Sequence, residues 1–191
     1  MKKKALAQIG FEFLSIVFAV LLALGLNSYK QNRDLEDEGL LLREKILKEC
    51  QRNNIELDSV LAVNKAFFVQ LDSLFRAESI QTNQFNISIE NELLTRSAWD
   101  FTKASRSFSY IDEDFLGDAA VLYEKQTYYM SIANQMFEKI GDMLMGDPDM
   151  EKVIKLTHYY LSNLNNAAED LKNTYSRFLE KYDSGLEQQN D

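Results

Sequence analysis

Turn-forming and metal-binding residues are scarce in this chain of 191 residues, and their scarcity excludes several classes of protein. The chain has 7 Gly and 1 Pro, against about 23 expected from average usage, so a fold of many short strands joined by tight turns is not expected. The single Cys, Cys50, has no partner for an internal disulfide. One Cys and one His are also too few for a zinc cluster or a di-iron bundle.

Catalytic and phosphate-binding motifs are missing as well. The net charge is −9, and the only basic cluster that we find is Lys2 to Lys4, so we expect no nucleic-acid partner. There is no Gly-rich phosphate loop and no nucleophile elbow. His158 has no catalytic partner nearby in the sequence, and no spacing of the carboxylates singles out an acid–base pair. We therefore predict that the chain is not an enzyme and has no cofactor and no metal site.

A long apolar run near the start of the chain carries the most information. The 18 residues from Ile9 to Leu26 follow Lys2 to Lys4, and their only clearly polar members are Glu12 and Ser15. As a helix this run is about 27 Å long, close to the roughly 30 Å of a bilayer's hydrocarbon core. We predict a transmembrane helix over residues 9–26. A cleaved signal peptide and a buried core helix are the alternatives that the sequence leaves open.

Basic residues around the run indicate an orientation. The three lysines lie before it, whereas Lys30 and Arg33 lie after it among acidic residues. By the positive-inside rule, residues 1–8 are expected in the cytoplasm and the rest of the chain beyond the membrane. The prediction is a single-pass protein of a bacterial inner membrane with a periplasmic C-terminal domain.

One face of the predicted span carries small and polar residues at steps of three or four: Glu12, Ser15, Ala19, Ala23 and Asn27. Small residues allow two helices to approach closely, so this face is predicted to pack against a second copy or another membrane protein. The high frequency of Ala and Ser in such helices is the alternative explanation. Glu12 lies about one turn inside the boundary, where a structural role is favoured over proton transfer.

The N-terminal residues also resemble a known family. The matching positions are Glu12, the apolar stretch Phe13 to Leu22, Ala23-Leu24, Asn27, Tyr29 and Arg33, followed by a long charged helix. This pattern is similar to that of a family of small, functionally uncharacterised membrane proteins common in Bacteroidota, which usually has Gly in place of Phe11 and Trp in place of Tyr29. The resemblance covers roughly the first 60 residues. It implies a single-span protein with a helical external domain, and it implies no activity.

Beyond the span, apolar residues recur at helical spacing in four segments. The first segment has its apolar face at Leu40, Leu47, Cys50, Leu57, Leu61, Phe68, Leu71 and Phe75, interrupted by Asn54 and Asn64. After a polar loop at 77–90, a second helix is expected from about Ser88 and should carry Trp99 and Phe101 toward the core. A third follows the acidic residues 112–114, and a fourth runs from Met150 to about Tyr182 after a turn at 146–149.

These segments predict an all-α fold, in which one N-terminal transmembrane helix continues into an elongated antiparallel helical bundle. The expected divisions are a cytoplasmic N-terminus (1–8), the span (9–26), a charged helical neck (27–39), the external bundle (40–183) and a flexible tail (184–191). Because no Pro separates Ser28 from Leu40, the neck continues the span either as one rod or with a bend near Gly39.

The function predicted from these features is that of a non-enzymatic, membrane-anchored interaction or scaffold protein, a subunit of a membrane complex. Its expected partners are membrane lipid, a second copy or another membrane protein through the span, and an external protein. One alternative is an external sensor of small molecules that acts through a partner, with a bundle pocket lined by Trp99, Tyr128, Tyr129 and Tyr160. The other is a proton-coupled, stator-like subunit that uses Glu12. Cys50 is expected to be a buried small hydrophobe.

Overall fold

The protein is all-α, as the sequence predicts. The computed structural model describes residues 2–76, 94–145 and 149–183, and these residues contain no strand. The elements are α1 (Lys2–Arg76), α2 (Ser97–Ala104), the 3-10 helix η2 (Arg106–Tyr110), α3 (Glu113–Leu144) and α4 (Met150–Tyr182). The predicted loop at 77–90, residues 146–148 of the predicted turn at 146–149, and the tail at 184–191 lie outside the described residues.

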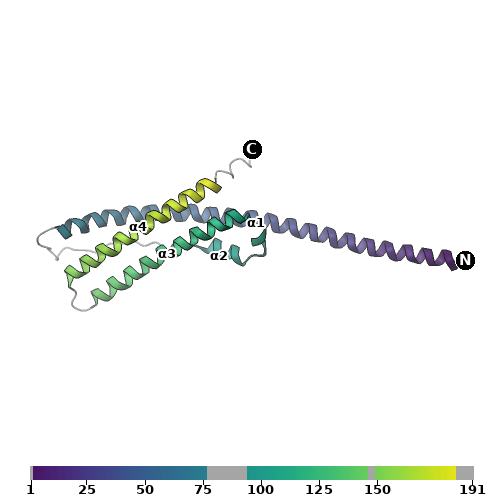
Figure 1. Ribbon diagram of the computed structural model, residues 1–191, viewed down its shortest axis with the longest axis horizontal. Helices are drawn as coiled ribbons and strands as arrows, with labels where there is room; N and C mark the ends of the chain where they lie inside the picture. The colour runs from purple at the N-terminus through teal and green to yellow at the C-terminus, as the bar shows by residue number, and fades with distance from the viewer. Residues whose placement is uncertain (1, 77–93, 146–148, 184–191) are drawn as a thin grey trace.

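Helix α1 is one uninterrupted helix of 75 residues, and its N-terminal part extends far beyond the other elements (Figure 1). Of the two alternatives for the neck, the single rod is therefore the observed one. Gly39 is buried where η2 crosses α1, and a Cβ atom added to it would lie 3.5 Å from the backbone oxygens of Ser107 and Tyr110. A side chain there would meet only ordinary van der Waals contacts, and Gly39 does not break the helix.

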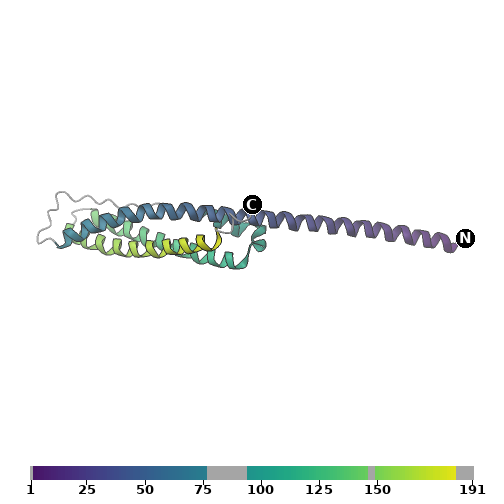
Figure 2. The same ribbon diagram turned by 90° about the horizontal axis from the view of Figure 1, so that it is seen from above.

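Helix α4 packs along both α1 and α3, and it runs antiparallel to each of them (Figure 2). Ion pairs join Asp58 of α1 to Lys172 and Lys65 to Glu169, so rising residue numbers in α1 meet falling numbers in α4. The α3–α4 pair shows the same pattern, because Asp118 pairs with Lys181 and Lys125 with Asp170. The predicted antiparallel packing of the last two helices is confirmed.

The core runs along the bundle between these three helices. Its largest fully buried side chains are Leu42, Ile46, Leu47, Leu57, Leu71, Phe115, Leu122, Tyr129, Met136, Ile154, Leu161 and Tyr175. Cys50 is buried as predicted. Leu40, which was expected on the apolar face, is instead 63% exposed, because Gly39 and Leu42 occupy the buried side of α1 at this level.

Local capping signals account for two helix starts. The Asp112 side chain accepts a hydrogen bond from the Phe115 amide at 2.8 Å, and Asp149 accepts one from the Lys152 amide at 3.3 Å. An N-cap carboxylate satisfies an otherwise unpaired amide of the first turn and interacts favourably with the helix dipole. The predicted starts of α3 and α4 are therefore confirmed.

The second helix differs from its prediction. It was expected from about Ser88, yet residues 94–96 are not helical and α2 has only 8 residues. The reason lies in the tertiary structure, because side chains of α1 and α3 bind the backbone of Leu94 and Thr95. Trp99 is buried, but Phe101 is 59% exposed and does not reach the core.

Candidate functional site

The apolar part of α1 makes the first candidate surface. The stretch is long and apolar enough to cross a membrane, and none of it is buried within the chain. The predicted packing face of Glu12, Ser15, Ala19, Ala23 and Asn27 is exposed along its whole length. Ser15 Oγ donates to the Glu12 carbonyl oxygen at 2.8 Å, a bond within the helix itself. The face is thus free for another molecule, and its packing role stays a prediction.

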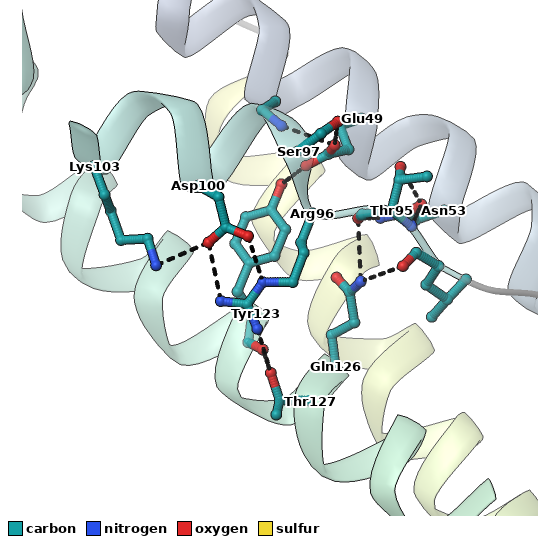
Figure 3. Close-up of polar contacts among 12 residues, drawn as sticks. Glu49, Asn53, Thr95, Arg96, Ser97, Asp100, Lys103, Tyr123, Gln126 and Thr127 are labelled. Atoms are coloured by element: carbon teal, nitrogen blue, oxygen red, sulfur yellow. Dashed lines mark hydrogen bonds and ion pairs between the residues drawn. The ribbon is translucent and has the colours of Figure 1, made fainter. Parts of the chain in front are cut away.

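The second candidate is a buried group of polar side chains at the centre of the bundle (Figure 3). We call it the polar cluster; its members are Glu49, Asn53, Tyr123, Gln126 and Tyr175. The members come from α1, α3 and α4, and together they surround residues 94–98, which lead into α2. The cluster therefore joins all three long helices to one short connecting segment.

Two amide side chains hold the backbone of this segment. Asn53 Nδ2 donates to the Thr95 carbonyl oxygen at 2.7 Å, while Asn53 Oδ1 accepts from the Thr95 amide at 3.0 Å. Gln126 Nε2 donates to the carbonyl oxygens of Leu94 and Thr95, both at 3.1 Å. These bonds satisfy backbone groups that have no helical partner, which is the requirement for burying them.

Glu49 holds the start of α2. Its carboxylate accepts from Ser97 Oγ at 2.9 Å, from the Ala98 amide at 3.0 Å and from Tyr123 Oη at 2.6 Å. Figure 3 shows the carboxylate above the first turn of α2. A carboxylate there caps the exposed amides of the helix and interacts favourably with its dipole. Three donors satisfy this buried charge, as the burial of a carboxylate requires.

Burial also fixes the protonation states around Glu49. It raises the pKa of the Cys50 thiol to about 12, and it raises the pKa of the Tyr123 and Tyr175 hydroxyls above their ordinary range. All three groups are neutral at physiological pH, so none of them is a thiolate or phenolate nucleophile. The chemistry of the polar cluster is that of holding backbone in place.

The four aromatic residues predicted to line one pocket do not lie together. Trp99 stacks on Tyr123 with ring centroids 5.4 Å apart, and Tyr129 is buried in the core. Tyr128 and Tyr160, in contrast, line one open groove of about 600 Å³ between α3 and α4. We call this the tyrosine groove, since Tyr159 lines it as well.

A basic groove of about 460 Å³ lies beside the polar cluster, between α1 and α2. Lys45, Lys48 and Arg52 line it, and Lys45 Nζ lies 5.6 Å from the centre of the exposed Phe101 ring. We expected no basic cluster beyond the N-terminus, and this groove corrects that expectation. The signal in the sequence is the spacing of three and four residues, which places the three cations on one face of a helix.

His158 lies between an aromatic ring and a carboxylate. The His158 ring stacks on Phe68 at 4.6 Å, and its Nε2 lies 3.7 Å from a carboxylate oxygen of Asp72. Over residues 2–76, 94–145 and 149–183, no three or more His, Cys, Asp or Glu side chains come together as metal ligands do. The three acids at 112–114 serve the start of α3 instead.

Comparison with known proteins adds no relative. No family model, no curated protein and no solved structure matches the chain.

Proposed function

We propose that this chain is a non-enzymatic, membrane-anchored interaction protein, in which α1 crosses the bilayer and presents the helical bundle on the far side as part of a membrane complex. The observation that carries the proposal is the continuity of α1. The same helix is apolar and wholly exposed at one end and packed into a bundle core at the other.

The distribution of the exposed apolar side chains favours lipid as their surroundings. Successive large residues are exposed on every side of the helix, namely Phe11, Phe13, Leu14, Ile16, Phe18, Leu21, Leu22 and Leu24. A single partner helix would cover only one stripe of such a surface. Lipid covers all of it, and the smaller face from Glu12 to Asn27 stays available for a second copy or another membrane protein.

The neck gives the bundle a fixed position relative to the span. Residues 27–38 continue α1 for about 18 Å without a break. Two bonds join this part of α1 to η2, from Ser107 Oγ to Glu38 at 2.6 Å and from Tyr110 Oη to Asn32 at 3.1 Å. Association of the spans would therefore set the spacing of the bundles, which is a useful property in a scaffold.

The polar cluster supports a non-enzymatic role. Its carboxylate is occupied by three donors from the chain itself, and its thiol and phenols are neutral. An acid–base or nucleophilic site needs a group that is free to exchange a proton or attack a substrate. The resemblance of the N-terminal residues to single-span membrane proteins supports the anchoring part of the proposal.

Membrane fractionation with a reporter fused after Asp191 tests the proposal. We expect the intact chain in the membrane pellet, resistant to carbonate extraction, with a periplasmic phosphatase reporter active. The double variant Leu14→Arg/Phe18→Arg places two charges in the span at about 2.5–3.5 kcal/mol each and should move the chain to the supernatant. Leu40→Arg changes an equally exposed leucine just beyond the neck; it is the matched control and should stay in the pellet.

Three outcomes would contradict this function. Recovery of the wild-type chain in the supernatant would remove the anchor, and mass spectrometry of a product starting near Leu26 would identify a cleaved signal peptide. Cross-linking through a cysteine introduced at Gln31, in a Cys50→Ser background, tests association. A chain that gives only monomer in intact membranes would overturn the role as a complex subunit.

A second candidate function, recognition of a small molecule outside the membrane, is favoured by the tyrosine groove. It is compatible with anchoring, because α3 and α4 form the groove without any contribution from the span.

A further inference from the structure

The tyrosine groove has an unusual lining for the surface of an acidic bundle. It is formed by Tyr128, Ile132 and Gln135 of α3 and by Tyr159, Tyr160, Asn163, Asn166, Ala167 and Asp170 of α4. Tyr128 is 63% exposed and Tyr159 60% exposed, so two aromatic rings are presented to solvent at the groove. Three side-chain amides lie among the rings, and Ala167 leaves room between the two helices.

The antiparallel packing of α3 and α4 arranges these groups in order. The Lys125–Asp170 ion pair, at 2.7 Å, places Tyr128 near the Asp170 end of the groove. Tyr159 and Tyr160 lie at the other end, with ring centroids 5.5 Å apart and the rings nearly perpendicular. From Tyr159 to Asp170 the groove follows α4 for about 16 Å. Aromatic rings therefore lie at both ends. Asn163 and Asn166 lie between them together with Ile132 and Ala167, and Gln135 lies toward the Tyr160 end.

The hydrogen-bonding capacity of the groove is largely unused within the chain. Among the described residues, none bonds to the side-chain amides of Gln135, Asn163 or Asn166. Each amide offers both a donor and an acceptor. The one carboxylate, that of Asp170, is neutralised by Lys125, which also donates to Thr174 Oγ1 at 3.2 Å. The groove thus offers many neutral donors and acceptors and no unpaired charge.

We propose that the tyrosine groove binds a carbohydrate chain. A sugar ring has an apolar face of C–H groups that packs on an aromatic ring, and a rim of hydroxyls that both donate and accept hydrogen bonds, as side-chain amides do. An anionic ligand would find no basic group free to bind it, and a cation would find Asp170 already paired. The length of the groove and its aromatic ends fit several linked sugar units.

The composition of the groove favours a carbohydrate over a protein segment. Protein interfaces concentrate their binding energy in a dry, apolar centre with a polar rim. Here the centre is not dry and apolar, since the side-chain amides of Asn163 and Asn166 lie there beside Ile132 and Ala167, and the tyrosines lie at the ends. This inference goes beyond the proposed anchoring role and does not depend on it, because the groove belongs to α3 and α4 alone.

Calorimetric titration of the full-length chain tests the inference, in a detergent without a sugar headgroup. The probes are the tetramers of β-1,4-linked N-acetylglucosamine, of β-1,4-linked glucose and of α-1,4-linked glucose. At least one of them is expected to bind saturably. Tyr128→Ala and Tyr159→Ala should each weaken its binding about tenfold, the scale of one lost ring contact. Tyr159→Phe keeps the ring and should retain binding.

Phe101→Ala is the matched control, because it removes an equally exposed aromatic ring from the basic groove on another part of the bundle. It should leave binding unchanged. Helix content and the unfolding midpoint, measured by circular dichroism, confirm that each variant is folded. The inference is overturned if none of the three tetramers binds at millimolar concentration, or if binding is indifferent to both tyrosine substitutions. It is equally overturned if those substitutions abolish cross-linking to a protein partner while no sugar binds.

Discussion

Asn53 has a role that none of its sequence neighbours shares. Its side-chain amide hydrogen-bonds to both the backbone amide and the carbonyl oxygen of Thr95. Asn53 Nδ2 also donates to Tyr175 Oη at 3.2 Å. One side chain thus replaces the partners that a second backbone strand would supply. The adjacent Asn54 is only half-buried, and its Oδ1 has no hydrogen-bond partner among the described residues.

The two asparagines allow a matched test. Asn53→Ala leaves the Thr95 amide without its partner and removes one donor each from the Thr95 carbonyl oxygen and the buried Tyr175 hydroxyl. We expect it to lower the free energy of unfolding by about 1–3 kcal/mol. Asn54→Ala should change it by less than about 1 kcal/mol. Urea unfolding followed by circular dichroism measures both. Equal effects of the two substitutions would contradict the role assigned to Asn53.

Cys50 should be chemically inert in the folded chain. Burial raises the pKa of its thiol to about 12, and the side chain has no exposed surface. Because the thiolate is the reactive form, labelling by a thiol reagent at pH 8 should be at least about a hundredfold slower in buffer than in urea. The rate is measured with Ellman's reagent. Rapid labelling of the folded chain would show that α1 opens around the polar cluster.

The sequence allowed the burial of Cys50 and Trp99 to be predicted, but not the roles of Glu49 and Asn53. A charged residue beside an apolar face is usually solvated, so Glu49 gave no sign of its burial. Its donors lie on Ser97 and Tyr123, which are 48 and 74 residues away. Only the folded chain brings these groups together, and local sequence patterns do not predict contacts between residues so far apart in the sequence.

At the scale of the elements, boundaries were predictable where the signal is local. Asp112 and Asp149 each cap the helix that follows them, and both starts agree with the structure. The extent of α2 was not predictable, because its preceding residues bond to Asn53 and Gln126 rather than to their own helix. Helix propensity is overridden there by tertiary contacts.

The α3–α4 pair should show a pH-dependent contact at Asp118. Its carboxylate accepts from Lys181 Nζ at 2.8 Å and from Tyr182 Oη at 2.7 Å. Both bonds lower the pKa of Asp118, and the bond from Lys181 has the larger effect. The stabilisation is therefore present above pH 3.8, the ordinary pKa, and is lost as the pH falls through the lowered value in the folded state.

We expect Asp118→Asn to lower the unfolding midpoint at pH 7 by no more than about 2 °C, because the pair is half-exposed and screened by water. The difference from the wild-type chain should shrink in high salt, and it should vanish once the pH has fallen through the lowered pKa of Asp118. Thermal unfolding at a series of pH values measures it. A difference that persists at low pH would mean that the substitution acts through packing.

At the scale of the whole molecule, hydropathy and helical periodicity were enough to predict an all-α chain with one long apolar run. They did not predict that α4 lies against both α1 and α3, or that this packing leaves a groove on the α3–α4 side. Periodicity identifies which face of a helix is buried, but not which helix buries it. Tyr128 illustrates the limit, because its exposure was predictable but its position beside α4 in the groove was not.

The span and the bundle should be separable, because every described side chain from residue 11 to 34 is exposed. A chain starting at residue 31 keeps the Asn32–Tyr110 bond and should be recovered in the supernatant, with a free energy of unfolding within about 0.5 kcal/mol of the full-length value. A chain starting at residue 45 also loses Leu42, which is 1% exposed, and should be less stable by about 2–5 kcal/mol or more. Urea unfolding of the three chains compares them. If the first truncation destabilised the bundle as much as the second, the apolar part of α1 would have to pack on the bundle rather than lie in lipid, and the anchoring role would fail with it.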